Sequence, residues 1–548
     1  MFNAYNPHRM HTSPFTSARS ILLLAAATVL FFPTWGKDPY PVNRNLDILH
    51  YAFHLEVNDT TDMLAGRSEI TFSLTGPQRS FEIDLAGLNK EGFGMQVESV
   101  GPESVVSAFE HRGDRIRINL TDAATGKQTL TIRYRGIPAD GFVISKNKFG
   151  DRTFFGDNWP DRGHHWLACV DHPSDKATVE FHVTAPDHYQ VVGTGALAEE
   201  SNLPGGRKVT VWKETAPVAV KVMTIGVSRF AVKYDQPSGG VQNSVWVFPQ
   251  NREAGFSDFS PSLRILEFFT ATIGPFSFSK LAHVQSKTRW GGLENAGNIF
   301  YFENSVTGKG TIEDLIAHES AHQWFGNSAT ESDWHHVWLS EGFATYFTHY
   351  YNEKVNGEAK RRSGMERDRN GLLKSDLLPQ RPVVDTTITE IGEVLSIITY
   401  QKASFVLHML RREVGDEAFM NGVRNYYASH RNGNALTTDF LRFMEQASGK
   451  DLSGFSKQWL FQPGAPEIQA TWQFYPKSGE GAVRIRQTGP RLFTFPLEIG
   501  IDEGRIEAVT ITGKEATFRF KTTKKPEKMI LDPNVNLLYR GKIEAGKL

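Results

Sequence analysis

The stretch TIEDLIAHESAHQWFGNS, residues 311–328, places two histidines and a glutamate inside an amphipathic helical pattern. Thr311 with Asp314 three residues later is typical of a capped helix start, so the helix is expected to begin there. Residues four apart share one face of a helix, so His318 and His322 can both direct an imidazole nitrogen at a single ion. The alternative is a pair of core or surface histidines with a solvated glutamate between them, and a third ligand decides between these interpretations.

A candidate third ligand lies in the segment WLSEGFATYF, residues 338–347, which has the pattern of a second apolar helix. The segment carries Glu341, with eighteen residues between it and His322. A carboxylate that faces the same interior as the two imidazoles completes a set of two histidines and one glutamate. Such a set leaves a fourth position for water, which is the arrangement of a catalytic zinc site. Histidine and carboxylate ligands without a thiolate suit zinc, with another divalent metal left open. We therefore expect one Zn²⁺ per chain, bound by His318, His322 and Glu341.

Glu319 lies between the two histidines and is the candidate general base. Zinc lowers the pKa of a bound water to about 7, so a nearby carboxylate can take the proton as the hydroxide attacks a carbonyl. Glu319 is adjacent to a ligand along the helix but points away from the ligand-to-metal direction, so it can reach the water without binding the metal. The motif therefore predicts metal-assisted hydrolysis.

Composition and charge argue against several other classes of protein. The chain has 548 residues, of which 40% are hydrophobic and 12% aromatic, and this suffices for well-filled cores in several domains. Lys and Arg number 60 and Asp and Glu number 61, for a formal net charge of -1. There is thus no electrostatic reason to expect a nucleic-acid partner or a protein bound to a membrane surface. The single cysteine, Cys169, excludes an internal disulfide bond.

The first residues differ from the rest of the chain. They carry Arg9 and Arg19 without an acid, and the apolar run ILLLAAATVLFF follows at residues 21–32. This run is short for a membrane span but suits the core of a signal peptide. We expect a signal peptide at residues 1–36, cleaved before Lys37, and export to the periplasm or out of the cell. The alternative is an uncleaved anchor through the apolar run, the one case in which membrane contact is expected.

The hydrophobic periodicity changes twice along the chain. Short alternating segments separated by Gly, Asp, Asn and Pro predict antiparallel strands through residues 37–245. Helical periodicity then dominates residues 246–462, and strand alternation returns in residues 463–548. We predict a multidomain α+β fold with an N-terminal antiparallel β-domain, a mainly α catalytic domain and a C-terminal β-domain.

Three motifs together resemble those of a known family. They are HESAH, its interval to WLSEGFA, and the upstream WGGLENAG at residues 290–297. With these motifs the sequence resembles the aminopeptidase N family of zinc metallopeptidases, the gluzincin exopeptidases, over most of the chain after the leader. The resemblance implies a thermolysin-like catalytic domain and a C-terminal β-sandwich.

The resemblance also raises a question about what covers the site. Many relatives continue into a helical fourth domain that closes over it, and this chain is expected to have no helical fourth domain. We therefore expect a more open cleft, unless a partner subunit or the helices within residues 352–378 cover it.

The resemblance assigns substrate contacts to the GGLEN segment. Glu294 matches the glutamate that binds the free α-ammonium of the substrate. A fixed carboxylate beside the metal favours a charged N-terminus over a chain that passes through the site. Gly291, Gly292 and Asn295 lie on the flanking backbone, which resembles the strand edge along which the peptide is laid. Leu293 stands where many relatives carry methionine, a change expected to alter the pocket for the first side chain.

Two further roles rest on the resemblance alone. Tyr400 matches a tyrosine whose hydroxyl stabilises the oxyanion of the tetrahedral intermediate, and such a donor is worth about 3–4 kcal/mol of the activation barrier. Composition alone favours a core aromatic residue at this position. Asp157, or its neighbour Asn158, falls where relatives carry a second contact to the α-amine.

The support of the metal ligands departs from the family pattern. Many relatives carry an acid two residues before the Trp-Leu pair, where this chain has His336. A carboxylate at that position is expected to brace a metal ligand, so Glu331 and Asp333 are the candidate replacements.

The sequence therefore predicts a zinc aminopeptidase that hydrolyses the N-terminal residue from peptides by attack of a metal-bound water. Its expected partners are peptides with a free N-terminus, and no oligomeric state is predicted. A thermolysin-like endopeptidase shares the metal ligands and the base, and Glu294 distinguishes the two enzymes. A non-catalytic peptide-binding scaffold is the third interpretation, although the ligands, the base and the tyrosine are all present.

Overall fold

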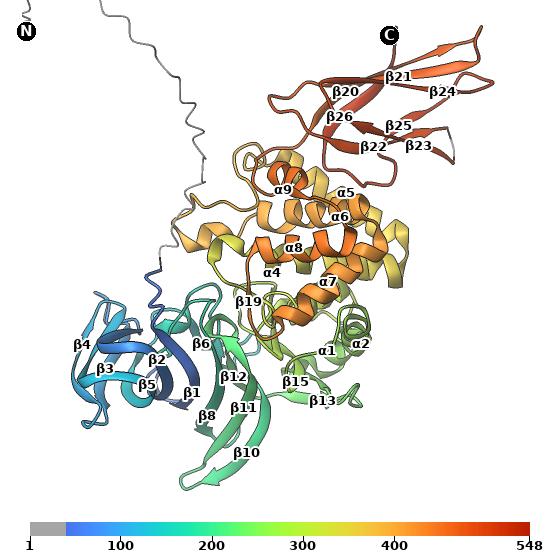
Figure 1. Cartoon of the computed structure of the whole chain (residues 1–548). Coiled ribbons are helices and arrows are strands. Elements are labelled where there is room, and N and C mark those ends of the chain that lie inside the picture. Colours follow the sequence, from blue (N-terminus) through green and yellow to red (C-terminus); the bar gives the residue numbers. More distant parts are fainter. Residues whose placement is uncertain (1–39, 503) are drawn as a thin grey trace, which may run out of the picture. The chain divides into compact units, whose positions relative to one another are not determined.

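The computed structural model describes residues 40–502 and 504–548 (Figure 1). The predicted signal peptide at residues 1–36, with its apolar run, lies outside the described residues. Within the described part, no helix combines the length and the apolar character needed to cross a bilayer. A β-rich N-terminal region is followed by a mainly helical region and a second β-rich region, so the predicted order of the three regions is confirmed.

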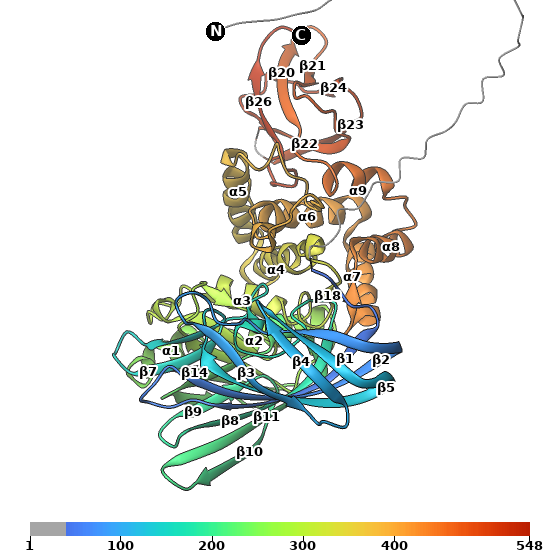
Figure 2. The same ribbon diagram turned by 90° about the vertical axis from the view of Figure 1, so that its left-hand side faces the viewer.

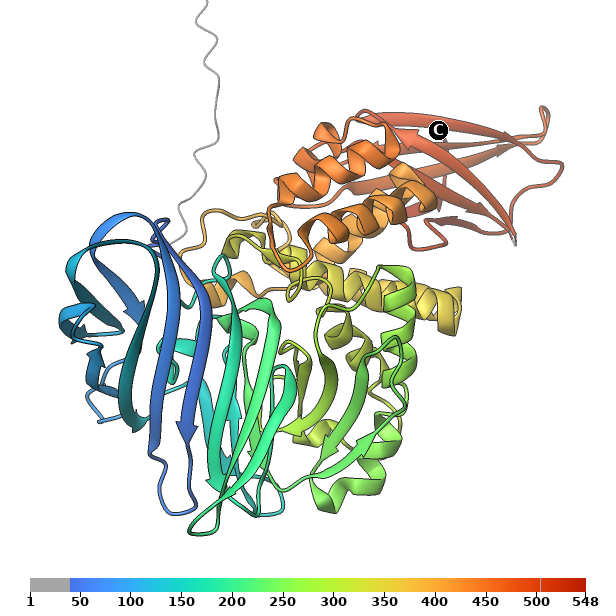
Figure 3. The same ribbon diagram turned by 60° about the horizontal axis from the view of Figure 1, so that its bottom comes forward.

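The N-terminal region contains a large sheet of long strands, whose side-by-side course Figure 3 shows. Its order is β10-β11-β8-β1-β2-β5-β3, with β4 paired to β5. Only β1 and β8 pair in parallel within this sheet. Alternate residues of β8 are buried, as expected when one face of a sheet covers a core. The strands are β1 (Leu46–Glu56), β2 (Leu64–Asp84), β3 (Gly94–Gly101), β4 (Val106–Arg112), β5 (Arg115–Ile137), β8 (Lys176–Pro186), β10 (Ala196–Leu203) and β11 (Arg207–Ala219).

The same region contains a second sheet, of four strands, and the segment that follows one of these strands carries Trp159. Its order is β6-β7-β12-β9. The strands are β6 (Phe142–Lys146), β7 (Arg152–Gly156), β9 (Gln190–Gly193) and β12 (Ile225–Ser228). Because β7 ends at Gly156, the next few residues carry Trp159 directly out of the sheet.

A five-stranded sheet lies at the start of the helical region, and the hydrophobic pattern did not predict it. Its order is β13-β14-β15-β17-β16, and β15 runs parallel to both of its neighbours. Every residue of β15 is buried, including His283 and Gln285, and a strand buried on both faces shows no alternation. The predicted domain boundary between residues 245 and 246 falls inside β14. The strands are β13 (Ala231–Tyr234), β14 (Gln242–Val247), β15 (Lys280–Ser286), β16 (Gly292–Leu293) and β17 (Asn298–Phe302).

Helix α4 (Trp338–Tyr351) is the central element of the helical region. All 14 of its residues are buried, as in a helix that is covered on every side. Helices α3 and α6 pack against it, and Figure 2 shows α4 between them. The other helices are α1 (Arg252–Asp258), α2 (Ser262–Thr272), α3 (Glu313–Ala321), α5 (Glu358–Lys374), α6 (Ala403–Val414), α7 (Asp416–His430), α8 (Thr437–Ser448) and α9 (Ser453–Trp459), and a short parallel pair joins β18 (Thr330–Glu331) to β19 (Asn434–Ala435).

The C-terminal region, red in Figure 1, consists of two sheets. One has the order β24-β21-β20-β26 and the other β23-β22-β25. Helix α5 is attached to this region, because Arg369 Nη1 donates to Asp532 Oδ2 at 2.6 Å and Arg361 Nη2 donates to the Asn534 carbonyl at 2.9 Å. The strands are β20 (Glu467–Tyr475), β21 (Glu480–Gln487), β22 (Phe495–Ile501), β23 (Arg505–Ile511), β24 (Glu515–Lys521), β25 (Met529–Leu531) and β26 (Arg540–Ala545).

A buried ion pair joins the N-terminal region to the helical region. Lys221, which follows β11, pairs with Glu331 of β18, and the two side chains are 2% and 0% exposed. The ammonium also lies 4.6 Å from the ring centroid of Trp159 and 5.6 Å from that of Trp334. The lysine therefore has a carboxylate and two aromatic faces as partners, which compensate for its loss of water.

We expect Lys221→Met to destabilise the protein by about 3–5 kcal/mol, because it leaves the Glu331 carboxylate buried without a partner. The double variant Lys221→Met with Glu331→Leu should recover most of this loss. Urea unfolding measures both effects. The exposed pair of Lys542 and Glu544 provides the control, since Lys542→Met should change stability by less than about 1 kcal/mol. Equal effects of the two lysine variants would contradict the role of the buried pair.

Candidate active site

Helix α3 begins at Glu313, later than predicted, and the predicted capping pair is wrong. Ile312 occupies the N-cap position and no side chain caps the helix. Asp314 instead accepts a hydrogen bond from Asn352 Nδ2 at 3.1 Å and pairs with Lys360. The two acids in the first turn still favour the helix start through the helix dipole. Asp314, which the local pattern assigned to capping, therefore makes tertiary contacts instead.

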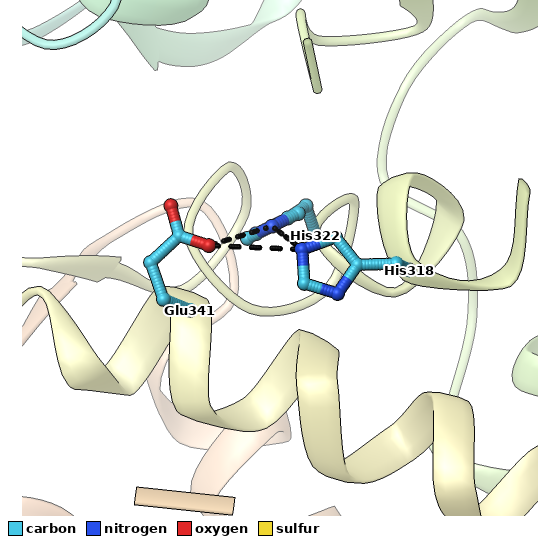
Figure 4. A group of neighbouring side chains, drawn as sticks. All are labelled: His318, His322 and Glu341. Carbon is cyan, nitrogen blue, oxygen red and sulfur yellow. Dashed lines mark hydrogen bonds and ion pairs between the residues drawn. The ribbon is translucent and has the colours of Figure 1, made fainter. Parts of the chain in front are cut away.

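The structure brings the three predicted metal ligands together (Figure 4). His318 Nε2 and His322 Nε2 lie 3.2 Å apart, and Glu341 Oε2 lies 3.7 Å from the first and 3.3 Å from the second. Ligand bonds of about 2.0–2.1 Å in a tetrahedral site separate the donor atoms by about 3.3 Å. Glu341 Oε2 is buried, and the two imidazole nitrogens lie beside it. The spacing and the convergence of three donor atoms both fit a divalent cation with zinc-like geometry.

His322 is braced by neighbours that the sequence did not single out. Its Nδ1 lies 3.0 Å from Ser340 Oγ and 3.3 Å from the Phe325 carbonyl oxygen. Donation from the Nδ1–H group to these oxygens leaves the lone pair on Nε2, the nitrogen nearest Glu341. Because Ser340 precedes Glu341 on α4, one helix supplies both a candidate ligand and the brace of another.

The predicted carboxylate braces have other partners. Glu331 pairs with Lys221, and Asp333 accepts a hydrogen bond from the His335 backbone at 2.8 Å. His336 is buried, and its Nδ1 lies 2.7 Å from Thr437 Oγ1. Glu331 and Asp333 are therefore paired with residues other than the three candidate metal ligands.

Glu319 and the backbone of Gly292 are in close contact. The Glu319 side chain is buried, and a Cβ atom placed on Gly292 would overlap its carboxylate. A Cβ on Gly291 would meet nothing within 4 Å. Residue 292 must therefore be a glycine, because any side chain there would displace the carboxylate of the candidate base, Glu319.

Glu294 is held in the same space by side-chain and main-chain contacts. Trp159 Nε1 donates a hydrogen bond to the Glu294 carboxylate. The Glu294 carbonyl accepts hydrogen bonds from Gln323 Nε2 at 3.0 Å and from Asn327 Nδ2 at 2.5 Å. Asn295 is also buried, but its amide makes no hydrogen bond within the described structure and does not line the cavity. The two amides therefore hold the Glu294 main chain, and the indole holds its carboxylate.

The site carries more negative than positive charge. Donor atoms of Glu294, Glu319 and His322 all lie within 4.8 Å of one another. Burial, together with the Glu294 carboxylate, raises the pKa of Glu319 well above its usual value, and burial also raises the pKa of Glu294. Burial alone would lower the pKa of His322, but Glu341 and the other carboxylates outweigh it and raise this pKa to about 10. Added positive charge would therefore stabilise the cluster.

Tyr400 completes the candidate site from a different segment. It belongs to the turn Ile398–Lys402 that precedes α6, and its ring lies parallel to that of His318 with centroids 6.2 Å apart. Burial raises the pKa of Tyr400 well above its usual value, and the carboxylates of the site add to this effect. The phenol therefore keeps its proton at neutral pH and can donate a hydrogen bond.

Asp157 is not brought to the cavity. Its carboxylate is fully buried and accepts hydrogen bonds from Arg162, from Thr288 Oγ1 at 3.1 Å and from the Arg289 backbone at 3.2 Å. The adjacent Asn158 donates to two main-chain carbonyls. From this segment it is Trp159 that reaches the cavity. An indole carries no obvious chemical signal in a sequence, which explains why it was missed.

A cavity of about 480 Å³ connects these groups, a volume within the usual range for small-molecule sites. Helix α5 forms part of its wall through Arg367 and Asp368, so the helices of residues 352–378, one of the two alternatives for covering the site, do line it. The lining residues come from the edge strand β16, from α3, α4 and α5, and from the turn before α6. They include Trp159, Trp290, Gly291, Gly292, Glu294, Asp314, His318, Glu319, His322, Glu341, Thr345, His349, Arg367, Asp368, Tyr400 and Gln401.

Comparisons with known proteins point to one family. Residues 48–219 match the Peptidase M1 N-terminal domain, and residues 259–459 match the Peptidase family M1 domain. A probable M1 family aminopeptidase 2 of Encephalitozoon cuniculi is 25% identical over 508 residues, which cover 86% of this chain and 58% of that protein. The glutamyl aminopeptidase of Bos taurus is 26% identical over 327 residues, which cover 57% of this chain and 34% of that protein. The chain thus spans less than two thirds of the length of these relatives.

A solved structure has the same architecture. The crystal structure of Legionella pneumophila aminopeptidase A in complex with aspartic acid matches with a TM-score of 0.76, over 93% of this chain and 61% of that chain. The sequences are 17% identical, so this match shows the fold alone.

We expect Gly292→Ala to lower turnover of an aminoacyl arylamide by about 100-fold, because a displacement of about 1 Å in a catalytic group costs this much. Gly291→Ala should lose far less, since its Cβ meets no neighbour. Steady-state kinetics and the metal content of both variants check the prediction. Equal losses in the two variants would show that the contact with Glu319 is not the cause.

Proposed function

The chain belongs to peptidase family M1, and on this premise we propose that it is a zinc-dependent aminopeptidase that removes the N-terminal residue from peptides. The observation that carries the proposal is the placement of Glu294. Its carboxylate shares one buried cluster with Glu319 and His322, and His322 also belongs to the cluster with His318 and Glu341. An anionic group thus lies within a residue's length of a metal-binding set.

The residues that would hold zinc are His318, His322 and Glu341. The spacing of their donor atoms and the burial of the Glu341 oxygen support this assignment. When bound, zinc would polarise the scissile carbonyl and lower the pKa of a water molecule. The ligand set contains no thiolate, which favours zinc over softer metals.

Glu319 is the residue that would move protons. Its carboxylate is buried beside His322 in the cavity, where it can reach a water molecule at the metal-binding set. It can take a proton from the attacking water and deliver it to the nitrogen of the leaving peptide. Gly292 leaves the space for this carboxylate, so the base and the substrate-binding backbone lie side by side.

Tyr400 would donate a hydrogen bond to the oxyanion of the tetrahedral intermediate. Its phenol keeps its proton at neutral pH, and it lines the same cavity as Glu319. A donor that is already in place costs no reorganisation when the negative charge develops on the carbonyl oxygen.

Glu294 would bind the α-ammonium of the substrate, and the edge strand β16 would bind its backbone. Trp159 holds the Glu294 carboxylate in one orientation. β16 pairs with β17 on one side only, so its other edge can accept an extended peptide as an added strand. These contacts favour an exopeptidase over the alternative, a thermolysin-like endopeptidase, because a chain passing through would leave Glu294 buried without a cation.

Export is part of the proposal and is supported by the sequence alone. The apolar run at residues 21–32 has the length of a signal-peptide core, and positively charged residues precede it. Action in the periplasm or outside the cell also agrees with a chain whose single cysteine is buried.

Cleavage should require a free α-amine. We expect alanine p-nitroanilide to be hydrolysed and its N-acetyl derivative to be resistant, because acetylation removes the cation that Glu294 binds. Glu294→Gln should raise KM for the free substrate by about 10- to 100-fold, the cost of losing one buried charge-assisted contact. Efficient cleavage of N-acetylated peptides by the wild type would favour the endopeptidase instead.

Glu319→Gln should separate metal binding from turnover. We expect the variant to bind one zinc per chain, because Glu319 is not in the ligand set, while kcat falls by about 10²–10⁴-fold with the loss of the base. His322→Gln is the counterpart, with zinc content expected to fall as well. Elemental analysis and kinetics are the two readouts, and unchanged kcat in Glu319→Gln would remove this residue as the base.

A further inference from the structure

Arg367 on α5 lines the cavity without an ionic partner. Within the described ranges 40–502 and 504–548, no carboxylate lies within the 4.0 Å limit of an ion pair with its guanidinium. The two acids on the same wall are already engaged. Asp368 Oδ2 lies 2.8 Å from His349 Nε2, and Asp314 pairs with Lys360 at 3.3 Å. The guanidinium is therefore an uncommitted positive charge at the cavity wall.

Arg367 and His349 approach the same glycine. A Cβ atom placed on Gly364 would lie 2.9 Å from His349 Nδ1 and 3.8 Å from Arg367 Nη2, so side chains of α4 and α5 both reach this part of the wall. Arg367 is exposed, so a ligand in the cavity can reach its guanidinium.

The cavity is lined by groups of opposite charge. Glu294, Glu319 and Glu341 supply carboxylates, and Arg367 supplies a guanidinium. A short peptide with free termini carries the matching charges, an ammonium at one end and a carboxylate at the other.

We propose that Arg367 is a binding subsite for a carboxylate of the substrate peptide, which makes short peptides with a free C-terminus the favoured substrates. This inference rests on the proposed function and adds a substrate class to it. The neighbouring acids have partners of their own, because Asp314 pairs with Lys360 and Asp368 Oδ2 lies 2.8 Å from His349 Nε2. A guanidinium is suited to the task, since its paired N–H groups match both oxygens of a carboxylate.

The test compares peptides that differ only in the C-terminal group. The substrates are trialanine and tetraalanine as free acids and as C-terminal amides, with alanine p-nitroanilide as a reference that has no leaving-side carboxylate. The variants are Arg367→Gln and Arg367→Lys. Arg362→Gln is the matched control, because Arg362 lies on the same helix and does not line the cavity.

We expect Arg367→Gln to lower kcat/KM for the free acids by about tenfold, mainly through KM, as expected for loss of one charge-assisted contact. The amides and the arylamide should change by less than twofold, Arg367→Lys should restore part of the loss, and Arg362→Gln should change nothing. Ala-Asp-Ala amide and Ala-Asn-Ala amide identify the source of the carboxylate. A selective loss on the aspartyl peptide would assign the subsite to an acidic side chain as well.

Equal effects of Arg367→Gln on acids and amides would overturn the subsite while the proposed function stands, provided the wild type still cleaves the arylamide. Failure of the zinc-loaded wild type to cleave any of these substrates would overturn the proposed function, and the subsite with it.

Discussion

The structure depends on keeping three carboxylates, those of Glu294, Glu319 and Glu341, together in a space with little water. Burial makes each charge costly, and mutual repulsion adds to that cost. The two imidazoles offset only part of it, as the raised pKa of Glu319 shows. A divalent cation and a substrate ammonium are the two charges that would complete the balance. Metal binding and binding of the substrate N-terminus would therefore both offset the same excess of negative charge, although different residues bind the two cations.

Helices α3 and α4 and the edge strand β16 hold these carboxylates together. Helix α4 is buried along its whole length, so Glu341 sits on an element with no freedom to move outward. Ser340, the residue before it, contacts His322 at the end of α3. On the other side, Gly292 of the edge strand leaves room for Glu319. The backbone that would bind the peptide and the carboxylate that would move the proton are thus in contact, and neither can shift alone.

The sequence predicted those parts of the site that lie on regular elements. His318 and His322 are related by helical spacing, and Glu341 follows on a strongly apolar helix, so local periodicity was enough. Residues brought in by tertiary contacts, such as Trp159 and Arg367, carried no pattern that spacing could reveal. The strands of the five-stranded sheet were missed because burial on both faces removes alternation. The predicted cap at Thr311 was wrong: the helix begins at Glu313, and Asp314 binds a distant asparagine, which no local pattern reveals.

Helix α5 connects the cavity to the C-terminal region. Arg367 faces the cavity, while Arg361 and Arg369 on the same helix bind the chain near Asp532. Arg361 and Arg369 are eight residues apart, close to two helical turns, so both can anchor one side of the helix. The C-terminal region would therefore act on the site indirectly, by holding a wall in place.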